Sequence, residues 1–450
     1  MDERWDLVVA GAGPAGCSLA AMTALEGATV LLLEKEDQPG LGRDWIVDVE
    51  STAFEEAGVP PPDPEASWHQ AGGQVMMSPT GGTTIDLLPP PVLPVRNGAY
   101  IRQLAGWAAE SGAEVRTGCR VLGPVLQGEA VAGVRVAQPG GGEVIIRSNL
   151  VADCTGITGA LRRGAPPDWD LGGEIDSRDI VQARREVRRI DPDAAAHWVE
   201  RGDIPDNVRV DKTGVMAAYS VEACHLDIDA GYIDILVGGK LGGRFPTADE
   251  WFARVVRRWP FVGEKIFGDG GIIPVRRTWN SLVGDGMLLL GDSACQVIPM
   301  HGSGTASALL AAKLATSAVI HALDEKRYDR RALWEYCRAF QSGRGSILAF
   351  FFVVQRHIDR LTGDDIDALI NRGMITAEDF YNGLVPLPLS YDPLTLAKKV
   401  ARGVAILPLL TGFGLSGLKA ERMMKHYQEF PSAYDRRELD RWISGLPRVS

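Results

Sequence analysis

The first strongly patterned part of the chain is a run of apolar residues at 5–10, which predicts a buried strand. A glycine-rich turn follows, then an apolar segment at 17–27 that predicts a helix and a second apolar strand at 28–34. Strand, turn, helix and strand in this order predict a right-handed parallel crossover. Because neither strand alternates with polar residues, we expect both faces of the sheet to be covered.

The next segments predict an insertion followed by a return to regular structure. Residues 59–94 are rich in proline and glycine and predict loops and short strands that form a lid or subdomain. The pattern then predicts a helix at 99–112, a strand at 113–125 and a hairpin over 131–156.

Residues 160–270 have a mixed pattern that predicts a second domain. We expect helices at 180–190 and 248–260, and strands at 214–224 and 231–239.

The last third begins with a second strand, turn and helix pattern at 286–323 and is helical from about residue 330, with one loop at 384–393. No stretch of about 18 uninterrupted apolar residues occurs, so we expect no spanning helix. The N-terminal residues lack the basic start of a signal peptide, and a cytoplasmic protein is expected.

Composition narrows the classes of function. The chain has 450 residues, and 47 Lys and Arg against 58 Asp and Glu give a net charge of −11, which argues against nucleic acid as a partner. With 45% hydrophobic and 23% charged residues, the chain is not mainly disordered. The six cysteines form no Cys-x-x-Cys pair, so we expect reduced thiols and no metal site.

The turn after the first strand has the glycine spacing of a dinucleotide-binding motif. It consists of Gly11, Ala12, Gly13, Pro14, Ala15 and Gly16. The first glycine permits a tight turn, the second lets the backbone approach a pyrophosphate, and the third lets the helix pack closely. Glu34, at the end of the second strand, has the position of an acid that accepts hydrogen bonds from ribose hydroxyls. The motif predicts dinucleotide binding and leaves NAD and FAD open.

A second motif favours FAD. A strand ends in Gly291-Asp292, and a proline-containing loop then leads to a glycine-rich helix start. We expect the Asp292 carboxylate to accept hydrogen bonds from polyol hydroxyls such as those of a ribityl chain. The helix start, whose N-terminus favours negative charge on a reduced flavin, includes Gly302, Ser303, Gly304 and Thr305.

These motifs resemble those of the p-hydroxybenzoate hydroxylase superfamily of flavoproteins. The resemblance also covers the turn at 153–156, where Asp153-Cys154-Thr155-Gly156 stands for the Asp-Gly turn of that superfamily. It implies that Arg102 or Arg96 contacts FAD and that the backbone of Val121 meets the adenine. Lys35 and Arg43 complete the implied cofactor site.

Within the superfamily the chain is most similar to the geranylgeranyl reductase family. The strand at 271–275, followed by a short segment and the Gly-Asp motif, carries this resemblance. The family's aromatic signature Tyr-x-Trp-x-Phe-Pro is not intact, and its nearest counterparts are 231–234 and 243–246. The resemblance implies an FAD-dependent oxidoreductase in which reduced flavin delivers a hydride from N5 to a C=C bond of an isoprenoid or prenyl lipid.

Alternatives remain open at this stage. The chain could instead be a flavin-dependent monooxygenase or halogenase, or a protein that binds FAD without turnover. The electron donor, NAD(P)H or another, is not visible in the sequence. His301 precedes the second glycine turn and is a candidate proton donor near the flavin or a structural histidine.

A cation-flanked apolar segment at 395–419 predicts either a buried helix pair or peripheral contact with a membrane. The combined patterns and resemblance predict an α/β fold with a discontinuous Rossmann-type FAD-binding domain built on a parallel sheet. The predicted boundaries are 1–58, 95–160 and 271–330 for this domain, 59–94 and 161–270 for an inserted mixed β-sheet substrate domain, and 331–450 for a helical C-terminal part.

Overall fold

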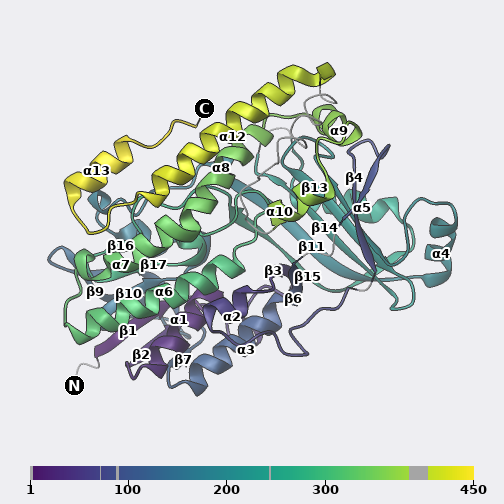
Figure 1. Ribbon diagram of the computed structural model, residues 1–450. Coiled ribbons are helices and arrows are strands. Elements are labelled where there is room, and N and C mark those ends of the chain that lie inside the picture. The colour runs from purple at the N-terminus through teal and green to yellow at the C-terminus, as the bar shows by residue number, and fades with distance from the viewer. Residues whose placement is uncertain (1–3, 71, 88–90, 243–244, 385–403, 450) are drawn as a thin grey trace.

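The computed structural model describes residues 4–70, 72–87, 91–242, 245–384 and 404–449. Two large sheets form the body of the molecule, and C-terminal helices lie across both (Figure 1). The mixed α/β fold with parallel and antiparallel strands confirms the predicted fold class.

The first sheet has eight strands, of which β10, β1, β2 and β7 are parallel neighbours and β17 is parallel to β10. β9 and β16 add antiparallel pairs at β10 and β17, and β8 pairs with β9. Its strands are β1 (Arg4–Ala10), β2 (Val30–Leu33), β7 (Glu114–Arg116), β8 (Arg120–Gln127), β9 (Ala130–Ala137), β10 (Glu143–Asp153), β16 (Val283–Gly284) and β17 (Met287–Leu289). The predicted strand at 113–125 is thus two strands, β7 and β8.

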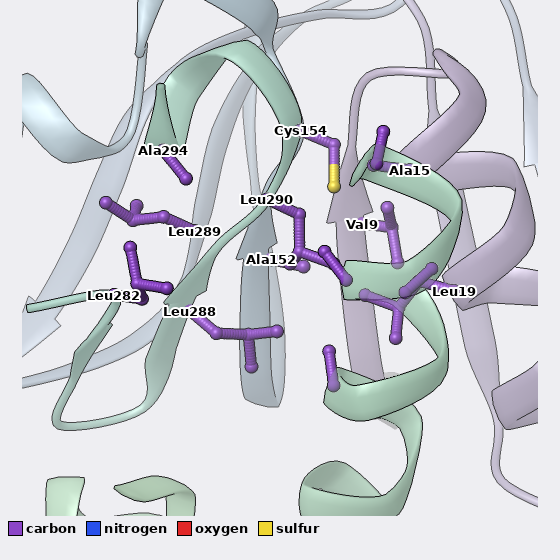
Figure 2. Packing of buried hydrophobic residues seen from close by; sticks show 14 of the residues in the cluster. Val9, Ala15, Leu19, Ala152, Cys154, Leu282, Leu288, Leu289, Leu290 and Ala294 are labelled. Atoms are coloured by element: carbon purple, nitrogen blue, oxygen red, sulfur yellow. The ribbon is translucent and has the colours of Figure 1, made fainter. Parts of the chain in front are cut away.

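Helices α1 (Pro14–Leu25), α3 (Asn97–Glu110) and α6 (Thr305–Asp324) pack side by side on this sheet, beside the short α2 (Ala53–Ala57) (Figure 1). Figure 2 shows Val9, Leu19, Ala152 and Leu290 packed together in this interior. By length and composition α6 could cross a membrane, but 61% of its apolar window is buried inside the protein. It is therefore a core helix of this domain.

The second sheet has seven strands in the order β15-β11-β14-β13-β12-β4-β5 and is antiparallel except between β12 and β4. Its strands are β4 (Gly73–Met77), β5 (Thr84–Asp86), β11 (Ile180–Ile190), β12 (Val208–Thr213), β13 (Ser220–Asp227), β14 (Tyr232–Lys240) and β15 (Val262–Pro274). Helix α5 (Ala248–Arg258) covers one face, where Ile233, Ile235 and Val237 of β14 pack against Trp251 and Val255. Helix α4 (Pro192–Glu200) follows β11.

The helix predicted at 180–190 is wrong, because this segment is β11, which lies between β14 and β15. The run of arginines there looked like a solvated helix. In the sheet its charges are neutralised across and along strands: Arg185 pairs with Asp234 of β14, and Arg184 and Arg188 pair with Glu186. Tertiary pairing thus overrides the local polar pattern.

Two segments lie in a different sheet from the one expected. The strand beginning at Gly271 is the end of β15, so it belongs to the seven-stranded sheet although 271–330 was predicted to be in the FAD-binding domain. Within 59–94, β4 and β5 join the seven-stranded sheet, whereas β6 (Val92–Arg96) pairs with β3 (Ile46–Glu50).

The C-terminal part is helical, as predicted. Helix α7 (Arg330–Phe340) continues through a π-helical turn at 341–345 into α8 (Ser346–Ile358). The remaining helices are α9 (Gly363–Asn371), α10 (Ala377–Leu384), α12 (Leu407–Gln428) and α13 (Arg436–Ser444). Most of the loop predicted at 384–393 lies outside the described residues. Figure 1 shows α12 along α8 at the upper edge of the molecule.

Candidate active site

A continuous cavity of about 2130 Å³ runs from the first glycine turn to the C-terminal helices. Both sheets and helices α8, α9, α10 and α12 contribute to its lining. A typical small-molecule site has roughly 300–1,000 Å³. The cavity is therefore large enough for a dinucleotide and a second molecule at once.

The glycine turn forms one polar end of this cavity, between β1 and α1. Gly11 has φ +103°, and a Cβ there would lie 2.3 Å from the Cys154 carbonyl oxygen, so only glycine fits. A Cβ on Gly16 would lie 1.9 Å from the Gly11 oxygen, which explains the close helix packing. Gly13 is different, because a Cβ there would meet nothing within 4 Å. The backbone at Gly13 therefore faces open space at the N-terminus of α1, which suits a pyrophosphate.

Glu34 lies directly after β2 and lines the cavity. Its Oε2 accepts a hydrogen bond of 2.8 Å from the Ala12 backbone N–H, and its Oε1 accepts one of 3.0 Å from Glu36. The side chain thus fixes the glycine turn. A carboxylate has about four lone-pair positions, so acceptor capacity remains for ribose hydroxyls.

The second motif forms the adjoining wall. Gly291 and Asp292 line the cavity, and the Gly291 N–H donates to the Gln296 side chain over 2.7 Å, which shapes the loop. The Asp292 carboxylate accepts no hydrogen bond from the described residues, and burial raises its pKa to about 6. A half-buried acceptor without a donor among the described residues fits a ligand that brings hydroxyl groups.

The start of α6 faces the same space. Gly302, Ser303, Gly304 and Thr305 all line the cavity, and Gly304 is the N-cap. The Ser303 hydroxyl donates to the Asp48 carbonyl oxygen over 2.9 Å and so ties this loop to β3. The positive end of the helix is thereby held toward the cavity.

Most of the other predicted cofactor residues also meet here. Lys35, Arg43 and Val121 line the cavity with the residues described above. Arg102 does not: it lies on the face of α3 that meets the loop after α2, and it pairs with Glu65 at 3.3 Å. Arg96 pairs with Asp44 and lies over the Phe267 ring, also outside the lining.

Asp153 organises the turn after β10. Its Oδ1 accepts hydrogen bonds from the N–H and hydroxyl of Thr155, and its Oδ2 accepts from the N–H groups of Leu161 and Arg162. The carboxylate is buried and does not line the cavity. It therefore holds the turn that carries Thr155 and Gly156 to the cavity wall.

A group of charged residues in the middle of the cavity wall was not predicted. Asp48 of β3 pairs with Arg185 at 3.4 Å and with Arg209 at 3.2 Å, and Arg209 also pairs with Asp211. Burial alone would raise the pKa of Asp48, but the two arginines outweigh it and hold the pKa below its usual range. Asp48 Oδ1 is buried without a hydrogen bond among the described residues. No sequence signal links these strands.

His301 lines the cavity close to this charged group. The Ser303 N–H donates to His301 Nδ1 over 3.4 Å, and the charge of His301 contributes to the lowered pKa of Asp48. In a neutral ring with Nδ1 as acceptor, the proton is on Nε2. His301 therefore lines the cavity, and its Nδ1 is engaged by the Ser303 N–H.

The other end of the cavity is apolar. Its wall is formed by the seven-stranded sheet and the C-terminal helices, and includes Met76, Ala218, Phe350, Val354, Ile366, Leu369, Ile370, Met374, Phe380, Leu410 and Phe413. The counterparts of the aromatic signature do not line it: Tyr232 is buried beside His225 and Trp68. Gly243 and Arg244 of the second counterpart lie outside the described residues, whereas Phe245 lies near Gly239.

Comparison with known protein families identifies one domain. Residues 4–202 match the family described as FAD binding domain.

Among curated proteins, the digeranylgeranylglycerophospholipid reductase of Sulfolobus acidocaldarius is 23% identical over 454 residues, which cover 97% of each chain. The digeranylgeranylglycerophospholipid reductase 1 of Methanopyrus kandleri is 28% identical over 364 residues, 76% of this chain and 89% of that protein. The similarity therefore extends from the glycine turn into the C-terminal part.

Solved structures share the fold. A geranylgeranyl bacteriochlorophyll reductase-like protein from Thermoplasma acidophilum superimposes with a TM-score of 0.69 and 18% identity over 90% of this chain and 99% of that chain. The myxobacterial chondrochloren halogenase superimposes with a TM-score of 0.61 and 18% identity over 98% of this chain and 96% of that chain.

Proposed function

We propose that this chain, an FAD-dependent oxidoreductase, belongs to the geranylgeranyl reductase family and reduces carbon–carbon double bonds of a prenyl lipid. The observation that carries the substrate class is the cavity itself, whose polar cofactor end continues into an apolar end between the second sheet and the C-terminal helices. A flexible hydrocarbon chain is the kind of ligand that such a wall accepts.

The residues at the polar end fit FAD. We propose that Gly11, Gly13, Pro14 and Ala15 hold the pyrophosphate and that Glu34 binds a ribose, with Lys35, Arg43 and Val121 around the adenosine part. Asp292, an acceptor without a donor among the described residues, suits the ribityl hydroxyls. The N-terminal end of α6, from Gly302 to Thr305, stabilises negative charge on the reduced ring. When bound and reduced, the flavin supplies the hydride.

The protein supplies position and a proton. A double bond held where the polar and apolar ends meet lies beside His301, which also lines the cavity. We propose that His301 Nε2 donates the proton that completes saturation. The Asp48–Arg209–Asp211 group keeps this wall charged and rigid, whereas the apolar end excludes water from the reacting carbon atoms.

The test is a mass comparison on prenyl lipids dispersed in detergent. Enzyme reduced with dithionite without oxygen is incubated with the lipid, and oxidised enzyme serves as the control. Mass gains in steps of two hydrogens, absent from the control, support the proposal. The H301Q variant is expected to retain FAD and to lose roughly 10²–10⁴-fold in rate, the usual contribution of a general acid.

The same prenyl lipids incubated with the enzyme and NADPH in air distinguish a reductase from a monooxygenase. A gain of one oxygen atom that occurs only in air contradicts the reductase and supports a monooxygenase. A halogenase would require a catalytic lysine in its tunnel, and the one lysine in the described lining is Lys35, at the adenosine end. No mass change in any sample, with FAD bound, contradicts the prenyl substrate.

We also propose peripheral contact with a membrane, because a lipid substrate must leave a bilayer to enter the cavity. Of the segment 395–419, residues 398, 399 and 402 lie outside the described part, whereas Lys419 lies inside it on α12.

A further inference from the structure

Helix α12 carries an exposed row of leucines. Leu407, Leu415 and Leu418 have 53%, 58% and 56% of their surface exposed in a protein whose other apolar residues are mostly buried. Their spacing of eight and three residues places them on one face of the helix. Thr411, also exposed, lies between them on this face, which we call the leucine face.

The leucine face adjoins the apolar end of the active-site cavity. Leu418 belongs to both, and Leu410, Phe413 and Gly414 of the same helix line the cavity. A hydrocarbon chain that leaves an apolar phase at the leucine face therefore meets the apolar end of the cavity at Leu418 and Leu410, and Glu421 is the charged residue that α12 adds to the lining.

A second cavity, of about 260 Å³, lies on the other side of the leucine face, between α8 and α12. It is lined by Val353, Arg356, His357, Arg360, Gly412, Leu415, Ser416, Lys419 and Val449. A water molecule occupies about 30 Å³ of liquid, so this space holds a much larger group. Leu415 is shared between the cavity and the leucine face.

Its polar lining is cationic and partly unpaired. Arg356 is neutralised by Asp179 and Asp359. In contrast, Arg360 and Lys419 make no ion pair or side-chain hydrogen bond with the residues that the structure describes, and His357 Nε2 is buried without a partner there. Arg360 and Lys419 are thus two cations of the cavity lining without an ion pair among the described residues, and such side chains pair with phosphate.

We propose that this cavity binds the phosphate headgroup of an anionic phospholipid and so seats the leucine face on a membrane. The arrangement deepens the proposed function, on which it rests, because it delivers prenyl lipid to the cavity mouth. The net charge of −11 would repel an anionic bilayer elsewhere, so the attraction must be local to this site.

The experiment is vesicle sedimentation of the FAD-loaded full chain. Vesicles of phosphatidylcholine alone are compared with vesicles of phosphatidylcholine and phosphatidylglycerol in equal parts. We expect binding to the anionic vesicles, weakened by salt, and an affinity about thirtyfold lower for R360Q/K419Q. That factor is ~2 kcal/mol, from about 1 kcal/mol for each basic residue at an anionic surface.

The matched control is R422Q/K425Q, which removes two exposed cations of α12 that have no ion pair within the described part of the chain and do not line the cavity. If the two double variants lose affinity equally, only diffuse surface charge acts, and the headgroup site is wrong. Equal binding to neutral and anionic vesicles also overturns it. L415S/L418S is expected to lose binding to the anionic vesicles although its charges are intact.

The outcome is separable from that of the proposed function. In detergent, R360Q/K419Q is expected to reduce prenyl lipid at the wild-type rate, because no bilayer is involved. Reduction in detergent without selective vesicle binding overturns the headgroup site alone. Selective vesicle binding without reduction in detergent contradicts the prenyl reductase and leaves the membrane site standing.

Discussion

Asp292 is a residue of the cofactor site whose ionised carboxylate destabilises the folded protein when FAD is absent. Its carboxylate lies in the cavity wall with no donor from the described residues, and burial raises its pKa from 3.8 to about 6. The folded protein without cofactor therefore holds the proton more tightly than the unfolded chain does. Such a group favours folding below about pH 4, and that contribution is lost as the pH rises through about 6.

We therefore predict that D292N stabilises the protein without FAD at neutral pH. A shift of about two pH units corresponds to up to ~3 kcal/mol, because each unit is worth 1.36 kcal/mol. Urea unfolding of wild type and variant, both freed of FAD, measures the difference. It should be near zero at about pH 4 and reach its full value above about pH 7. A difference that does not change with pH contradicts the raised pKa.

At the scale of single residues, the sequence predicts local backbone geometry where a motif requires particular residues. The turn from Gly11 to Gly16 requires glycine for steric reasons that act within a few residues, so its position follows from the pattern. That Arg102 or Arg96 contacts FAD was implied by the resemblance and stays a prediction, because Arg102 pairs with Glu65 and neither arginine lines the cavity. Asp48 and Arg209 were missed because only the folded chain brings β3 and β12 together.

Among the elements, β11 shows how a sheet can tolerate a charged strand. Arg185 and Asp234 are each only 4% exposed, and the guanidinium nitrogen lies 2.6 Å from the carboxylate oxygen. The helix prediction for 180–190 rested on the charges alone. It failed because the neutralising acid lies on β14, more than 40 residues away in the sequence.

Removing one partner leaves the other buried and uncompensated. We predict that R185L lowers the free energy of unfolding by about 3–5 kcal/mol, and that D234N in the R185L background restores part of it. R189L is the matched control, because Arg189 lies on the same strand in an exposed pair with Glu264. It should cost about 1 kcal/mol or less. Denaturant unfolding of wild type, R185L, R185L/D234N and R189L measures these differences. Equal losses in the free energy of unfolding for R185L and R189L would contradict a stabilising buried pair.

At the scale of the whole molecule, the active-site cavity depends on segments that are far apart in the sequence. Gly13 follows β1, Asp48 lies on β3, Ala218 precedes β13, Asp292 follows β17 and Phe413 lies on α12, yet all five line one space. Local patterns predicted the two motifs at its polar end, because each is a contiguous turn. They could not predict the apolar end, because packing between β4, α9 and α12 creates it and no single segment does.

Because α12 forms part of this wall, a larger side chain on α12 should shorten the apolar end of the cavity. Leu410 lines it and is half-buried, so L410W adds volume inside the cavity without disturbing the FAD-binding sheet. We predict that kcat/KM for the longest prenyl chains falls by at least about tenfold, since one misfitting group costs about 1–3 kcal/mol, while short chains are reduced as before. Leu25→Trp, at an exposed position at the end of α1, is the control and should leave every chain length unaffected. The test is to measure rates in detergent for prenyl lipids of different chain length. A loss of rate at every chain length would mean that the tryptophan disturbs the fold. A loss confined to long chains would mean that the hydrocarbon tail extends to α12.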